Sequence, residues 1–218
     1  MRIRSFIIAY ALVLAILLFA DRRPGSSHQD RYSHVVDLTD GEIPSSPRAA
    51  AAPSKTHIIA PGALIPGTWA AGQIPAERLI APLVVMELSS TETQISLDDI
   101  AAWESHHGMI PQGAVLAVRS TGTLDKTSEE ASATFPIARD AAQFLIDARY
   151  TIGFAVETPV DFAADRTLAR QIALRGAYVV EGATHLQTVP ATGSLVIVAP
   201  AKDKKPGDAQ VRVLAMVR

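Results

Sequence analysis

Residues 81–120 read APLVVMELSSTETQISLDDIAAWESHHGMIPQGAVLAVRS and contain two apolar runs separated by a helical pattern. The runs APLVVMEL (81–88) and GAVLAVRS (113–120) have the length and continuity of buried strands. Because strands that are apolar on both faces must be covered on both faces, this stretch predicts an α/β fold.

The helix between these strands is predicted over 97–107. Ser96 can cap its first turn, Asp99 has the spacing of a capping box, and Gly108 is typical of a helix end. The residues expected to form its apolar face are Leu97, Ile100, Ala101 and Trp103.

The other predicted elements alternate in the middle of the chain and become strand-rich near its end. A second helix is predicted over 138–149, with Ala142, Phe144, Leu145 and Ala148 on its packing side. A single helical turn is predicted within 73–80, starting at Pro75, and an irregular connection over 41–55. Further strands are predicted at 34–38 (short and buried), 152–158, 177–181, 194–200 and 211–217. This order predicts one α/β domain with a mixed sheet over 34–218.

The composition is that of a globular protein. The chain has 218 residues, of which 48% are hydrophobic and 19% charged, and its formal net charge is −2. The absence of a large basic cluster argues against nucleic acid as a partner. With no cysteine, the fold has neither disulfides nor a thiol nucleophile and depends on its core.

The N-terminal segment has the features of an export signal. Arg2 and Arg4 precede sixteen uncharged, mostly apolar residues over 5–20. We predict a signal peptide or signal anchor over 1–24 and a linker over 25–33. The domain is then periplasmic or secreted, or anchored by residues 5–20, and this segment is its only expected membrane contact.

Residues with catalytic potential are few and scattered. No phosphate-binding loop, nucleophile elbow or H-E-x-x-H motif occurs. His106 and His107 are adjacent and point in different directions on a helix, so we interpret them as residues of its last turn that suit the helix dipole. The complete set of histidines is His28, His34, His57, His106, His107 and His185.

Several segments together resemble the cyclase family, whose best-known members are bacterial kynurenine formamidases. The resemblance covers nearly all of residues 34–218. It implies a swivelling β/β/α fold, usually dimeric, and metal-dependent hydrolysis of amides or cyclic amides such as N-formylkynurenine or isatin. The segments are VVDLTDGEIP (35–44), THIIAPGALIPGTWAAGQIPAERLIAPLVVMELSS (56–90), SLDDIAAWESHHGMIPQGAVLAVRSTG (96–122), AAQFLIDARYTIGFAVETP (141–159) and GAYVVEGATHLQTVPATGSLVIVAP (176–200).

The family motif His-x-Gly-Thr-His-x-Asp-x-Pro-x-His is retained only in part. In the family, its first two histidines and the aspartate bind metal and the last histidine is a base; a later histidine, twelve residues before a glutamate, also binds metal with that glutamate. Of these six functional positions, only His57 and Glu181 keep the family residue. The replaced positions are Pro53, Ile59, Ala63 and Ala169, together with Lys55 at the motif glycine.

This loss leaves few donors for the zinc or manganese that the resemblance implies. A catalytic zinc typically takes three protein ligands and a water, so we expect metal binding to be weak or absent. A rebuilt site remains an alternative, in which His57 and Glu181 are joined by Glu157, Asp161 or His185. Without a metal, we expect His57 to be a partly buried histidine that bonds to the backbone and Glu181 to be a carboxylate that is hydrogen-bonded to a turn.

Two functional classes stay open, and whether the chain is an enzyme is uncertain. The first interpretation is a degenerate, exported family member that serves as a binding or interaction module, as a homodimer or paired with a homologue. The alternative is an active metal-dependent amidohydrolase of the arylformamidase type, acting on C–N bonds of a small aromatic amide. Trp69 matches the family segment beside the substrate pocket, where it could stack an aromatic ligand; the competing interpretation is an ordinary core or interface tryptophan.

Overall fold

The computed structural model describes residues 32–40, 56–121, 134–202 and 207–218. Residues 34–218 form one compact unit. The predicted signal segment, most of the predicted linker and the predicted irregular connection over 41–55 lie outside the described residues.

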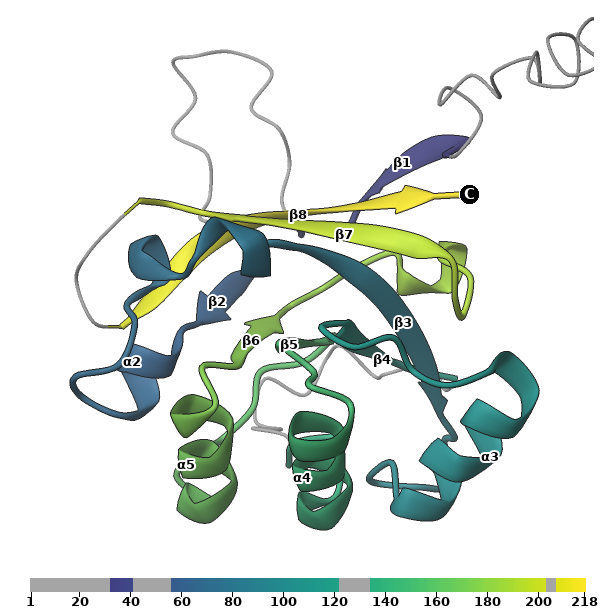
Figure 1. Ribbon diagram of the computed structural model, residues 1–218, viewed down its shortest axis with the longest axis horizontal. Helices are drawn as coiled ribbons and strands as arrows, with labels where there is room; N and C mark the ends of the chain where they lie inside the picture. The colour runs from purple at the N-terminus through teal and green to yellow at the C-terminus, as the bar shows by residue number, and fades with distance from the viewer. Residues whose placement is uncertain (1–31, 41–55, 122–133, 203–206) are drawn as a thin grey trace, which may run out of the picture. The chain divides into compact units, whose positions relative to one another are not determined.

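A single mixed sheet organises this unit (Figure 1). The strand order is β1-β8-β2-β6-β5-β4-β3-β7, and β7 also pairs with β8, so seven strands close into a barrel-like ring to which β1 is added. The strands are β1 (His34–Asp37), β2 (His57–Ile59), β3 (Ile80–Leu88), β4 (Val115–Ser120), β5 (Gly153–Val156), β6 (Tyr178–Glu181), β7 (Ser194–Pro200) and β8 (Asp208–Val217).

Strands β3 to β6 form the parallel half of the ring, and helices α3, α4 and α5 lie on its outer side (Figure 1). β2, β7 and β8 pair antiparallel with their neighbours. The α/β class and the mixed sheet predicted from the sequence are therefore confirmed. The helices are α2 (Pro61–Leu64), α3 (Leu97–His107), α4 (Arg139–Ala148) and α5 (Arg166–Leu174), with short 3₁₀ turns η2 (Ala71–Gln73), η3 (Ala76–Arg78) and η4 (Leu186–Thr188).

Alternation along the strands separates two apolar cores. In β2, Ile58 packs in the core inside the ring, whereas Ile59 packs in the core between the sheet and the helices. Tyr178 is fully buried in the inner core, where burial raises the pKa of its phenol and the hydroxyl donates to Arg78 O at 2.9 Å. Gly153 lies opposite Tyr178, where an added Cβ would collide with the ring.

The predicted helix over 97–107 is confirmed with its cap. Asp99 N donates to Ser96 Oγ at 3.2 Å, and Ser96 N donates to Asp99 Oδ2 at 2.7 Å. Its predicted apolar face is wrong in part, since Ile100 is buried and Trp103 half-buried while Leu97 and Ala101 are exposed. The reason is position: α3 flanks the β3 side of the helix layer, with α4 as its helix neighbour (Figure 1).

Other sequence predictions need correction at single positions. Helix α4 forms as predicted, but Ala148 is exposed because the last turn extends beyond the apolar contacts of Leu145. β1 is partly exposed rather than buried, since it pairs only with the end of β8, whereas Leu38, just after it, is buried. The predicted turn after Pro75 is the 3₁₀ turn η3.

Helix α5 and strand β2 are among the elements that were not predicted from the sequence. Helix α5 buries Leu168, Ala169 and Ile172 and begins at Asp165, whose side chain accepts from Leu168 N at 3.0 Å. Its apolar spacing and its cap were signals that could have revealed it. β2 has only three residues, too few for a recognisable period.

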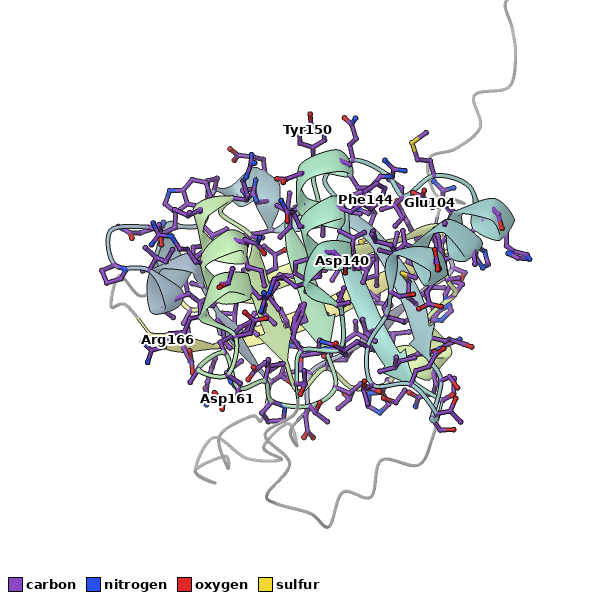
Figure 2. The ribbon with its side chains drawn as sticks, turned by 90° about the horizontal axis from the view of Figure 1, so that it is seen from below. Glu104, Asp140, Phe144, Tyr150, Asp161 and Arg166 are labelled. Carbon is purple, nitrogen blue, oxygen red and sulfur yellow. The ribbon has the colours of Figure 1, made fainter. Side chains whose placement is uncertain are left out.

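An ion pair joins α3 to the end of α4. Arg149 Nε and Nη2 donate to the two carboxylate oxygens of Glu104 at 2.7 and 2.8 Å, and Ile110 N donates to Glu104 Oε1 at 3.0 Å. Figure 2 shows Glu104 and Tyr150 at one end of the helix layer and Asp161 and Arg166 at the other. The ion pair of Arg149 and Glu104 thus holds α3 and α4 together at the end of the helix layer opposite Asp161.

This pair predicts a loss of stability in acid. The hydrogen bonds from Arg149 hold the pKa of Glu104 below its ordinary value of 4.5, so its contribution is present above that pH and is lost as the pH falls through the lowered pKa. Urea unfolding should therefore show that Glu104→Gln reduces the free energy of unfolding at pH 7 more than at pH 3. An equal reduction at both pH values would contradict this role of the ionised carboxylate.

Candidate functional site

His57 and Glu181 face each other across neighbouring strands. They are paired in the antiparallel register of β2 and β6, and His57 Nε2 lies 2.8 Å from Glu181 Oε2. The side chain of Glu181 is only 4% exposed, whereas that of His57 is 28% exposed. The structure thus brings together the two residues that keep the family's metal-ligand identity.

The other carboxylate oxygen of Glu181 is also occupied. Val160 N, in the connection between β5 and α5, donates to Glu181 Oε1 at 2.8 Å. A buried carboxylate needs hydrogen-bond donors on its oxygens, and the imidazole and this amide meet that need. Glu181 therefore ties the connection after β5 to the sheet.

Thr56 fixes the start of β2 beside the pair. Its buried hydroxyl donates to Gly182 O at 2.7 Å and accepts from Asp40 N at 2.6 Å. These bonds join the residues before β2, after β6 and after β1. This role of Thr56 was not predicted from the sequence, although the match of Thr56 to the family motif was a signal for it.

The replaced family positions are filled by apolar packing. Ile59 and Ala169 are buried in the core between the sheet and the helices, and Ala63, on α2, packs against it from a half-buried position. His57 and Glu181 point toward the same side, because Ile59 and Val179 lie two residues away on the same strands. The pair therefore borders this core. Pro53 and Lys55 lie outside the described residues.

The side chains that could join His57 and Glu181 in a rebuilt metal site instead make contacts elsewhere. Glu157 Oε2 accepts from Ser120 N at 2.8 Å, and Asp161 Oδ1 accepts from Ala163 N at 2.8 Å. His185 Nδ1 lies 3.1 Å from Asp37 O. His185 has a left-handed backbone conformation and is the N-cap residue of η4. Across the described residues, no three His, Cys, Asp or Glu side chains gather closely enough to hold a metal ion.

The donor set of the pair does not fit a catalytic zinc site. One imidazole and one carboxylate supply two ligands where three are typical, and they are directed at each other. The neighbouring positions Ile59, Ala63 and Ala169 carry hydrocarbon side chains without a donor atom. As arranged, the pair can share a proton and hold strands together.

The indole ring of Trp69 is partly exposed to solvent. It is 38% exposed, the guanidinium of Arg78 lies 5.7 Å from its ring centroid, and Gly176 packs so closely that an added Cβ would collide with the ring. Arg78 Nη2 donates to Gly176 O at 3.0 Å, and burial lowers the pKa of Arg78. The partly exposed ring thus lies against Gly176, just after α5, and beside Arg78 of η3.

Comparison with known proteins finds the same fold in several solved structures. Isatin hydrolase A from Labrenzia aggregata, bound to benzyl benzoate, has a TM-score of 0.68 at 24% identity, over 84% of this chain and 93% of that chain. Isatin hydrolase A from Ralstonia solanacearum has a TM-score of 0.67 at 25% identity, over 85% and 92%. A potential metal-dependent hydrolase with cyclase activity has a TM-score of 0.64 at 22% identity, over 85% and 98%. No curated relative matches the sequence.

The N-terminal part of the domain identifies the family to which the chain belongs. A family model described as putative cyclase matches residues 33–161, more than half of the chain. The chain therefore belongs to the cyclase family, as the resemblance in its motifs predicted. Two of the solved structures with a similar fold are themselves described as a potential and a predicted metal-dependent hydrolase.

The contact between His57 and Glu181 predicts a measurable coupling. His57→Ala leaves the buried carboxylate with a single amide donor and should lower the free energy of unfolding by about 1–3 kcal/mol. In a double-mutant cycle by urea unfolding, His57→Ala and Glu181→Gln should couple by about 0.5–3 kcal/mol.

The matched control for this cycle is the exposed pair of Arg139 and Asp165, whose closest oxygen–nitrogen distance is also 2.8 Å. Its coupling should be smaller, about 0.2–1 kcal/mol, because solvent screens it. Equal coupling energies in the two cycles would show that burial does not strengthen the interaction of His57 with Glu181.

Proposed function

We propose that this chain is a degenerate cyclase-family protein that keeps the family fold as a binding or interaction module, with weak or no metal-dependent amide hydrolysis. The observation that carries this proposal is the direct 2.8 Å contact between His57 and Glu181, with hydrocarbon side chains at the other family positions. The pair retains a structural task after the loss of its partners, since it satisfies a buried carboxylate.

The chemistry of family hydrolysis explains why these replacements matter. A zinc ion lowers the pKa of its bound water so that hydroxide is available near neutral pH. Ile59 removes a carboxylate that would balance the cation, and Ala169 removes an imidazole. Ala63 removes the general base, which typically contributes 10² to 10⁴ in rate. The replacements therefore affect both the metal-bound hydroxide, which is the nucleophile, and the general base.

One observation favours the alternative of an active amidohydrolase of the arylformamidase type. His57 and Glu181 remain adjacent, as two ligands of one zinc or manganese ion would have to be. The third ligand would then come from another part of the chain or from a partner subunit. Isatin or N-formylkynurenine would be the substrate class to test.

The proposed location and assembly follow from the sequence and the family. We infer export through residues 1–24 and a periplasmic, secreted or anchored domain that forms a homodimer or pairs with a homologue. In the part of the chain that the structure describes, no helix combines the length and apolarity that a membrane span requires. Residues 5–20 lie outside that part.

Hydrolysis assays on residues 25–218, supplied with zinc or manganese, test the proposal. The protein should release product from isatin and N-formylkynurenine no faster than its own His57→Ala variant, because neither carries a complete metal site. An isatin hydrolase assayed in parallel verifies the substrates. Metal-dependent turnover that exceeds the His57→Ala rate would contradict the proposal and support the alternative.

A further inference from the structure

The outer face of the antiparallel strands is apolar, although helices α3, α4 and α5 lie on the other side of the molecule (Figure 1). Along β7 and β8, alternate residues such as Val196 and Val213 point into the core inside the ring. The residues between them point outward and belong to neither core. Together with the outward residues of β1 and of the start of β3, they form a surface that we call the outer sheet face: Val35, Ile80, Leu195, Ile197, Leu214 and Met216.

The strand register arranges these six side chains in two rows across the sheet. The rows are Leu195–Met216–Val35 and Ile80–Ile197–Leu214. Directly opposite residues of neighbouring strands have Cβ atoms about 4.5–5.5 Å apart, so each row is a continuous line of hydrocarbon. Val35 and Ile80, at the two edges, are 59% and 57% exposed, and the other four side chains are partly exposed.

This face departs from the usual pattern of an antiparallel sheet, in which the face away from the core is polar. Strand β8 shows both patterns in turn. Its outward residues are polar at Asp208, Gln210 and Arg212 and apolar at Leu214 and Met216. The two apolar positions are those that lie between β7 and β1. Because monomeric proteins rarely expose large contiguous apolar patches, the outer sheet face has the character of an interaction surface.

The charges at the border of the face neutralise each other. Asp37 follows Val35 at the next outward position of β1, and Arg212 precedes Leu214 at the previous outward position of β8. Arg212 Nη2 donates to Asp37 Oδ2 at 3.1 Å. A surface complementary to the two rows is therefore itself flat, aliphatic and without net charge.

A second copy of this chain offers such a surface, because its own outer sheet face has these properties. Two sheets pack face to face about 10 Å apart, as in a β-sandwich, and a two-fold axis makes the contact closed and self-complementary. A bilayer is a poorer match. Membrane-binding faces combine Trp or Phe with a border of Lys and Arg, whereas the two rows contain no aromatic residue and Arg212 is already paired.

The size of the face predicts a weak dimer. The two rows together span four strands, so at the usual spacings of strands and residues they measure about 19 by 13 Å. A stable interface buries about 800 Å² on each partner, as an apolar core within a polar rim. The rows can supply that core, and neighbours such as Ala199 and the Arg212–Asp37 pair can supply part of the rim. We expect a dissociation constant on the order of micromolar.

We propose that the outer sheet face binds the same face of a second copy of the chain in a two-fold dimer. This inference rests on the proposed function and deepens it, since it names the surface through which the interaction module associates. The contact requires neither a metal nor the His57–Glu181 pair.

Sedimentation velocity on residues 25–218, which include the compact unit of residues 34–218, tests the proposal. The parent should change from monomer to dimer as its concentration rises through the micromolar range. Ile197→Lys combined with Leu214→Glu should weaken the dimer about tenfold or more, because both charges would lose water in the interface. The two new side chains lie directly opposite each other on β7 and β8, where opposite charges are tolerated within the sheet.

A matched control places the same two charges on exposed apolar residues elsewhere. Leu97→Glu combined with Met109→Lys changes side chains that are 38% and 72% exposed, at the start of α3 and just beyond its end. This variant should dimerise as the parent does. Circular dichroism verifies that both double variants are folded.

A single introduced thiol locates the interface. The chain has no cysteine, so Ile197→Cys places the only thiol in the middle of the outer sheet face. Maleimide should modify it several-fold more slowly at concentrations at which the protein is dimeric than at concentrations at which it is monomeric. Leu97→Cys should react at the same rate at both concentrations.

Three results would each overturn the proposal: a parent that stays monomeric, a dimer that Ile197→Lys with Leu214→Glu leaves intact, or a thiol at position 197 that the dimer does not protect. A monomeric parent that sediments with phospholipid vesicles would assign the face to a membrane instead. These failures differ from a failure of the proposed function. A monomer without metal-dependent hydrolysis removes only this dimer, whereas metal-dependent turnover of isatin overturns the proposed function.

Discussion

The three residues of β2 hold the two halves of the molecule together. On one side β2 pairs with β6, the last strand of the parallel half, and on the other with β8 of the antiparallel half. Without this strand the ring of seven strands would be open, with unpaired edges on both β6 and β8. The site depends on the same strand, because the register that closes the ring sets His57 opposite Glu181.

This dependence explains how the fold can be kept while the site changes. Ile59 packs in the core between sheet and helices, where the family motif has an aspartate, and Ala169 packs on α5 where the family has a histidine. Burial of hydrocarbon in these places favours folding, whereas clustered charged ligands without a metal would oppose it. In the function that we propose, these replacements shift the role of this region from ligand binding toward packing.

The sequence predicted the parallel half of the fold well and the closure of the ring poorly. Strands β3 and β4 and helix α3 were predictable because apolar runs and the Ser96–Asp99 cap are local signals. β2 was missed because its three residues are defined by pairing with β6 and β8, which local sequence does not encode. Leu97 was wrongly assigned to the core because periodicity gives a helix face and not the neighbour that covers it.

The candidate site was predictable only through the family motif. Composition and spacing gave no reason to join His57 with Glu181, which are far apart in the sequence, and the motif supplied both. The contacts of Thr56 and Val160 depend on how turns after different strands meet, so they required the structure. The outer sheet face was not predicted either, because its two rows depend on how β1, β7 and β8 pair.

The most direct test of this account is the metal content of residues 25–218 after purification without chelator and dialysis against zinc and manganese, measured beside Glu181→Gln. We predict less than stoichiometric metal in both proteins, because His57 and Glu181 supply two ligands to a site that needs three. One tightly bound ion per chain in the parent, lost in Glu181→Gln, would contradict the account and show that a metal site has been rebuilt around this pair.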